Sequence, residues 1–147
     1  MNKILLIIVF LSTLHIVSAQ LKFRIFEDLP DVRRELSNSG VKWDTFNNNN
    51  GNLMIGISYA NITEFLEFDI ETGMCIAQGF ETTSSQYDSS TLELILSFCD
   101  KYSCRTRKSN TNTQWQIEIS KEGFLDVFRV VNASNISWRI ELKLYKK

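Results

Sequence analysis

The sequence predicts a single, mainly β domain: an antiparallel β-sandwich or jelly-roll-like fold with one or two short helices. Segments in which apolar and polar residues alternate recur along the chain, as expected of strands with one buried face. The single proline, Pro30, leaves every later strand uninterrupted. Aromatic residues make up 12% of the chain, which is enough to fill a core. A small β-barrel is the alternative, because composition does not distinguish a filled core from a hollow one.

Residues 1–19 are expected to be a secretory signal peptide and residues 20–147 a single secreted domain. Lys3 supplies the positive start, residues 4–11 are apolar, and Val17-Ser18-Ala19 fits the small-residue cleavage rule. The apolar run is too short for a membrane span, and no later segment approaches the roughly 20 apolar residues that a span needs. We therefore expect a secreted, extracellular protein without a membrane span.

The first half of the domain is expected to contain a strand, a short helix and four further strands. Residues 21–25 alternate as a strand. Leu29, Val32 and Leu36 recur with helical spacing, and Pro30 stands in the first turn, where proline is tolerated. The next strands are expected at 41–46, 53–59, 62–70 and 74–80, with an Asn50-Gly51 hairpin turn between the first two.

The second half is expected to end in three consecutive strands, at 114–120, 124–131 and 136–145. The polar stretches 81–90 and 101–113 are expected to be surface loops. Residues 90–99 fit a helix and a strand almost equally, and a capping box beginning at Ser90 favours the helix. Trp115 and Trp138 fall on the apolar sides of their strands and are expected in the core. We find no internal repeat and no second domain.

The only histidine, His15, lies in the predicted signal peptide. Without it, the secreted chain has no histidine base, no Ser-His-Asp or Cys-His pair and no histidine-containing zinc site. We expect no metal site, no cofactor and no enzymatic activity. The best remaining acid/base pair is Glu67 and Asp69, two residues apart on one strand face, so a carboxylate-based hydrolase stays an alternative.

Cysteines and sequons agree with an extracellular setting. Three cysteines predict one disulfide and one odd thiol, which could join two chains into a disulfide-linked dimer. The sequence does not choose the pair among Cys75, Cys99 and Cys104. Three N-glycosylation sequons at predicted turns or strand starts predict a glycoprotein. They begin at Asn61, Asn132 and Asn135.

Charge is divided unevenly along the chain. Between Trp43 and Asp100 there are nine acids and no lysine or arginine, whereas ten basic residues and four acids follow from Lys101 onward. Pairing of opposite charges between the two parts is the simplest interpretation, and oriented association with a partner is the alternative. The densest basic cluster, a candidate site for a sulfated glycan or an acidic protein surface, comprises Lys101, Arg105, Arg107 and Lys108.

These observations favour a non-enzymatic extracellular recognition protein that binds a protein or glycan partner. The binding candidates are the basic cluster and Trp43, which could stack on a sugar ring if it is exposed. Nucleic acid is not expected, because the chain carries a formal net charge of −1 and no recognisable nucleic-acid module. A carrier of an apolar small ligand in a β-barrel is the first alternative, and the carboxylate-based hydrolase is the second.

Overall fold

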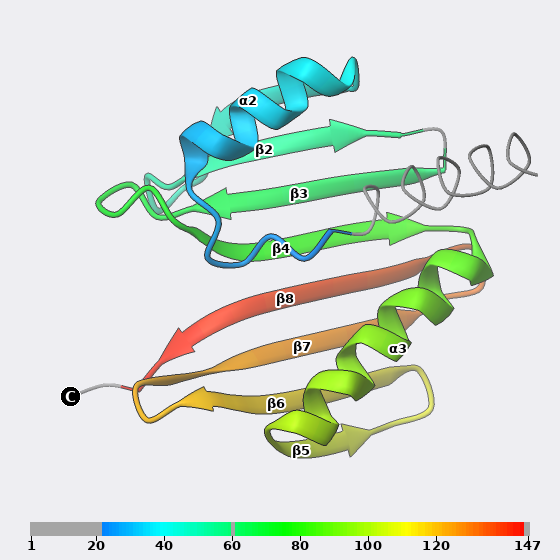
Figure 1. The fold of residues 1–147 in the computed structure, drawn as a ribbon. Coiled ribbons are helices and arrows are strands. Elements are labelled where there is room, and N and C mark those ends of the chain that lie inside the picture. Colours follow the sequence, from blue (N-terminus) through cyan, green and yellow to red (C-terminus); the bar gives the residue numbers. More distant parts are fainter. Residues whose placement is uncertain (1–21, 60, 146–147) are drawn as a thin grey trace, which may run out of the picture.

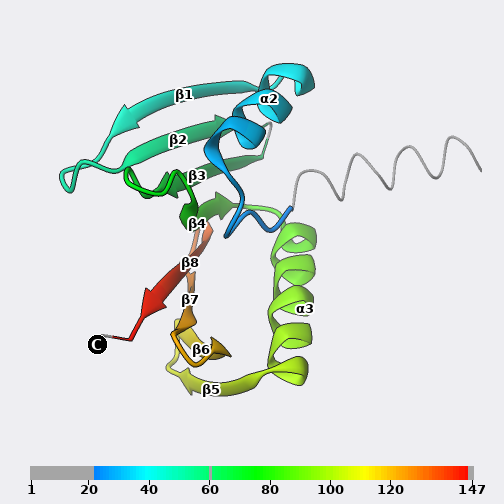
Figure 2. The same ribbon diagram turned by 60° about the vertical axis from the view of Figure 1, so that its left-hand side comes forward.

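The structure, a computed structural model, describes residues 22–59 and 61–145; the predicted signal peptide lies outside the described residues. The mainly β, antiparallel prediction is confirmed. Within these ranges, eight strands form one open sheet, and two helices make a second layer on one of its faces (Figures 1 and 2). No helix in the described ranges is long and apolar enough to cross a membrane.

The chain builds the same arrangement twice: a helix followed by a four-stranded antiparallel meander. The two meanders pair through their last strands, β4 and β8, so the sheet order is β1-β2-β3-β4-β8-β7-β6-β5. The residues of the two halves differ, so the repeat is not visible in the sequence. The elements are α2 (Leu29–Ser39), β1 (Lys42–Asn47), β2 (Leu53–Ser58), β3 (Ile62–Phe68), β4 (Cys75–Thr82), α3 (Ser85–Lys101), β5 (Ser103–Lys108), β6 (Asn112–Ser120), β7 (Gly123–Val131) and β8 (Ile136–Leu144).

Both helices form where apolar residues recur at helical spacing. In α2, Val32 and Leu36 are buried, and the helix ends at Gly40, whose φ of 70° suits a left-handed cap. Residues 90–99 are helical, which settles the ambiguity in the sequence. The helix α3 begins at Ser85, however, so the prediction of a surface loop over residues 81–90 was wrong. Asp88 lies in its first turn, faces inward and is buried.

Two strand assignments also differ from the prediction. Residues 22–25 are not a strand: Arg24 turns inward and is buried, and its backbone N–H donates to the Gln78 side chain instead of to a neighbouring strand. Residues 103–108, within an expected loop, form the edge strand β5. All six of its residues are exposed or only partly buried, so it lacks the apolar alternation that reveals a strand.

The core lies between the helices and the sheet, as expected for a two-layer domain. Trp115 and Trp138 are buried there, and their rings stack at 5.7 Å between centroids. The carboxylate of Asp88 connects α3 to this stack. It accepts hydrogen bonds from Trp138 Nε1 at 3.0 Å and from Arg129 Nε at 2.7 Å, so helix and sheet share one polar contact inside the core.

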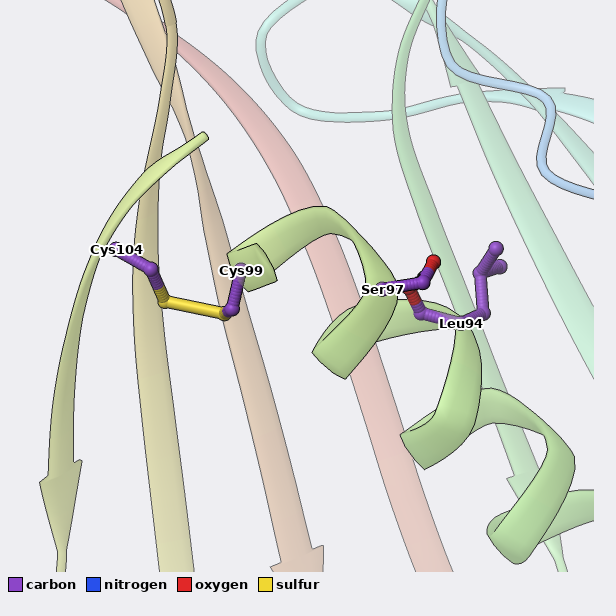
Figure 3. The surroundings of a disulfide bond; sticks show 4 residues. All are labelled: Leu94, Ser97, Cys99 and Cys104. Carbon is purple, nitrogen blue, oxygen red and sulfur yellow. Dashed lines mark hydrogen bonds between the residues drawn. A yellow bond between two sulfur atoms is a disulfide. The ribbon is translucent and has the colours of Figure 1, made fainter. Parts of the chain in front are cut away.

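One disulfide joins Cys99 in the last turn of α3 to Cys104 in β5 (Figure 3). It closes a loop with a sequence separation of five residues and fixes the end of the helix to the edge of the sheet. The third cysteine, Cys75, is unpaired and fully buried. A disulfide-linked dimer through this thiol, which the sequence allows, would require the chain around Cys75 to open.

Candidate functional site

The sheet divides at one end, where an apolar concavity lies. The strand β8 pairs with β4 only as far as Glu141↔Ala77, but it continues along β7 to Leu144↔Gly123. Residues 22–28, here called the strap, run beside the start of β4 where β8 has departed. Phe26 N donates to Cys75 O at 3.0 Å, and Cys75 N donates to Glu27 O at 2.9 Å.

The resulting groove has a volume of about 670 Å³ and lies between the strap, the end of α3 and the β6–β7 turn. Its walls are mostly apolar, and the polar groups that it presents come from Tyr102, Ser120 and Glu122. The volume falls within the range of roughly 300–1,000 Å³ that is usual for small-ligand sites. The apolar lining is Phe23, Phe26, Met74, Phe98, Ile119, Gly123, Leu125, Leu142 and Leu144.

The strap supplies two aromatic walls of the groove. The Phe23 ring lies 5.2 Å from the Phe98 ring of α3, between centroids. Phe26 is the one non-glycine residue with positive φ, 77°, among the described residues, and its side chain is 45% exposed. A left-handed backbone at a non-glycine residue costs roughly 1–2 kcal/mol, so the fold holds Phe26 at the groove despite a local cost.

A buried polar network fastens the strap to the sheet. Gln78 of β4 accepts from Arg24 N at 3.0 Å and donates to Lys22 O at 2.9 Å. Its Nε2 also donates to the carboxylate of Glu64 at 2.6 Å, and the Tyr59 hydroxyl donates to the same carboxylate at 3.3 Å. Glu64 is only 4% exposed, and burial raises its pKa to about 7 against the opposing effects of Gln78 and Arg24.

The cation of the network, Arg24, is neutralised by other acids. Its guanidinium donates to Glu35 of α2 at 2.9 Å and to Glu27 of the strap at 3.0 Å. The hydrogen bond from Arg24 is the main reason why the pKa of Glu35 falls to about 2. Glu64 makes no ion pair within 4.0 Å in the described chain, so it is a buried carboxylate held by neutral donors.

The predicted binding residues are only partly brought together. The side chains of Arg105 and Arg107 point to the face of the sheet that carries no helix. Lys108 points to the opposite face, and Lys101 is the last residue of α3. Trp43 points to the helix side of β1 and packs against the core, so it is not the exposed platform that sugar stacking requires.

The two acids of the hydrolase hypothesis do not form a catalytic pair. Glu67 accepts hydrogen bonds from Asn48 at 2.8 Å and Asn52 at 2.9 Å, which fastens the asparagine-rich hairpin to β3. Asp69 lies beyond the end of β3 and caps the next turn, accepting from Thr72 N at 2.7 Å. That hydrogen bond is the main reason why the pKa of Asp69 is lowered. Both carboxylates therefore have structural partners.

A reactive thiol and a metal site are two further kinds of functional site to consider. Burial raises the pKa of the Cys75 thiol to about 12, so the thiol stays protonated and is not a nucleophile. Residues 22–59 and 61–145 contain no group of three or more His, Cys, Asp or Glu side chains that could hold a metal ion. The candidate site that remains is the apolar groove.

The three sequons lie at the opposite end of the sheet from the groove. Asn61 precedes β3, and Asn132 and Asn135 flank the β7–β8 turn. The strand register brings these turns together, because Ile62 pairs with Thr82 and Thr82 with Ile136. A glycan at any of them would leave the groove uncovered.

Comparison of the chain with protein-family models, with curated proteins and with solved structures finds no match. Function therefore has to be argued from the geometry. The groove could not be found from the sequence, because its walls come from five separate parts of the chain. The one available signal was the pair of phenylalanines in the strap, at positions 23 and 26, but their spacing resembles that of a strand or a turn.

Proposed function

We propose that the protein is a non-enzymatic extracellular binding protein that takes up a small apolar ligand in the groove. The observation that carries the proposal is an apolar groove of about 670 Å³ that the fold leaves unfilled beside a well-packed core. Each Å² of apolar surface that a ligand removes from water contributes roughly 25 cal/mol to the free energy of binding. The Tyr102, Ser120 and Glu122 side chains would orient a polar group at one end of that ligand.

The extracellular setting rests on sequence features together with the disulfide. The predicted signal peptide directs the chain to secretion, and an intramolecular disulfide between Cys99 and Cys104 is compatible with an oxidising compartment. Glycosylation at Asn61, Asn132 or Asn135 would add solubility at the end remote from the groove.

A protein partner is the second candidate, and a separate observation favours it. Apolar side chains are exposed at the groove end of the sheet: Leu144 of the groove lining is 69% exposed, and Ile70 in the β3–β4 turn, outside the lining, is 66% exposed. Exposed apolar side chains that lie together mark interaction surfaces. A protein that inserts an apolar side chain into the groove would cover them.

A fluorescent apolar probe tests the proposal directly. N-Phenyl-1-naphthylamine titrated into the secreted protein should show saturable binding at one site. The variant Phe26→Asn should weaken this binding about 10-fold or more, because it removes an aromatic wall worth roughly 1.5–3 kcal/mol when covered. Asparagine tolerates the left-handed backbone at this position better than phenylalanine does, so the fold should be retained.

The matched control is Leu96→Asn, which removes an apolar side chain of 47% exposure from α3 outside the groove lining. It should bind the probe like the unmodified protein. Equal affinity in the Phe26→Asn variant would place the probe elsewhere and refute the groove as its site. Native mass spectrometry of the secreted protein should show a co-purified apolar molecule. If the natural partner is a protein instead, no apolar molecule should co-purify and the probe should show no saturable binding.

A further inference from the structure

The fold neutralises most of its cations outside one region. Six basic side chains of the described chain form ion pairs within 4.0 Å, and the Arg24 and Arg129 pairs are partly or largely buried. The paired side chains are Lys22, Arg24, Arg34, Arg129, Arg139 and Lys143. The other seven basic side chains of the described residues form no ion pair there, and their positions are the exceptions to this neutralisation.

The exceptions concentrate in the basic cluster. Lys101, Arg105, Arg107 and Lys108 are all exposed and form no ion pair with another described residue. The ammonium of Lys101 lies 5.4 Å from the centroid of the Tyr102 ring and has no acidic partner there. The other unpaired cations of the described ranges, Arg33, Lys42 and Lys121, are scattered over three separate parts of the fold.

The cluster follows a free edge of the sheet. The strand β5 pairs only with β6, so its outer side carries no neighbour. Six residues of a strand span roughly 17 Å, and Arg105 and Arg107 stand about 7 Å apart on one face. Lys108 lies on the other face, so cations flank the edge on both sides. The Cys99–Cys104 disulfide holds the end of α3 beside the start of this edge (Figure 3). Lys101 is the last residue of that helix.

Shallow hollows along this edge offer polar and aromatic contacts. Arg107 and Lys108 line one of about 260 Å³ together with Gln114 and Phe128. Arg105 lines a smaller one of about 100 Å³ with Gln116, Tyr145 and a single acid, Glu118. Amide groups suit hydroxyl groups of a sugar, and aromatic rings suit its apolar face.

We propose that the free edge of β5 binds a linear sulfated polysaccharide. Exposed cations spaced along a strand edge match an extended chain with fixed negative charges better than they match a compact anion. The adjoining amide and aromatic side chains match the sugar rings between those charges. This site is separate from the apolar groove, so polysaccharide binding here does not depend on whether the groove holds a ligand.

Heparin affinity measured at several salt concentrations tests the proposal. The double variant Arg105→Gln/Arg107→Gln should bind at least 10-fold more weakly than the unmodified protein, and its affinity should depend less steeply on salt, because fewer counterions are released. The matched control Arg33→Gln/Lys42→Gln removes the same charge from exposed, unpaired positions, one of them on the opposite edge strand β1. It should keep its affinity within about twofold.

Three outcomes would overturn the proposal. Failure of the unmodified protein to bind heparin at physiological salt is the first. Equal loss of affinity in both double variants is the second, because it would indicate an effect of net charge alone. Equally tight binding of duplex DNA or polyglutamate of similar charge density would reject a sulfated polysaccharide as the specific ligand. Chemically desulfated heparin should not bind. Circular dichroism spectra of the variants, which change only exposed side chains, should match that of the unmodified protein.

Discussion

Glu64 lies beneath the strap that forms one wall of the groove, and its replacement by glutamine isolates the effect of its charge. The carboxylate is buried, accepts from Gln78 and Tyr59, and has no cation within ion-pair distance in the described chain. The amide in Glu64→Gln can still accept from Gln78, and it can donate to the Tyr59 oxygen. The substitution therefore removes a titration while it keeps the size and hydrogen bonds of the side chain.

The size of the effect follows from the pKa of Glu64, which is about 7 in the folded protein against a usual 4.5. At a pH between these two pKa values, Glu64 holds a proton in the folded protein but has released it in the unfolded chain. The free energy of unfolding therefore decreases as the pH rises through this range. A difference of about 2.5 pKa units corresponds to roughly 3 kcal/mol. The protein should thus be most stable near pH 5 and lose up to about 3 kcal/mol by pH 8.

The groups around Glu64 do not reproduce this profile. Glu35 has a pKa lowered to about 2, so it contributes stability above pH 4.5 that is lost only as the pH falls toward 2. Its side chain is 41% exposed, which reduces that contribution further. Arg24 and Lys22 stay charged throughout the range, and desolvation raises the pKa of Tyr59 above its usual 10.

Urea unfolding followed by tryptophan fluorescence at pH 5, 6, 7 and 8 measures the effect. The unmodified protein should lose stability across this range, whereas Glu64→Gln should be nearly flat and more stable than the unmodified protein at pH 8. Equal slopes for the two proteins, or a flat profile for the unmodified one, would refute the argument that Glu64 titrates near neutral pH. Probe affinity measured in parallel should follow strap stability and weaken at pH 8.

Two further substitutions test the packing. Asp88→Asn should lower the free energy of unfolding by roughly 2–3 kcal/mol, because Arg129 loses a partly buried charged partner. Thermal unfolding measures this change. The control Glu93→Gln, at an exposed position of the same helix, should change the free energy of unfolding by less than about 0.5 kcal/mol. Gly123→Ala should lower the free energy of unfolding by roughly 1–3 kcal/mol, because the new Cβ would lie 2.5 Å from the backbone oxygen of Lys143. In Gly56→Ala the new Cβ would meet only ordinary van der Waals contacts, so this variant is the control. Similar losses of stability in both variants would contradict this account.

The parts of the fold that sequence alone could predict are those in which burial alternates. The strands β6, β7 and β8 were predicted almost to their ends because an apolar face repeats along each. The edge strand β5 gave no such signal, because each of its residues remains at least partly exposed. An alternating pattern was also misleading at residues 21–25, where Arg24 is buried through its bonds to Glu27 and Glu35.

The site was less predictable than the fold, because it depends on long-range contacts. The Phe23 and Phe98 rings meet across 75 residues of sequence, and no local pattern indicates such a contact. Trp43 was chosen as a binding candidate for its residue type, but its strand orientation directs it toward the core. The basic cluster was visible in the sequence, whereas the distribution of its members over two faces depends on β5 being a strand.

The repeated helix-and-meander arrangement has a consequence for how this surface could diversify. Fusion of two identical half-length chains that had formed a symmetric dimer through β4 and β8 would give this topology. Once both halves belong to one chain, they no longer need to be chemically equal. The edge strands β1 and β5 occupy equivalent places in the sheet, yet β1 carries Lys42 and Asp44, whereas β5 carries Arg105, Arg107 and Lys108 and no acid. Covalent linkage thus allows one edge to acquire a ligand without imposing the same ligand on the other.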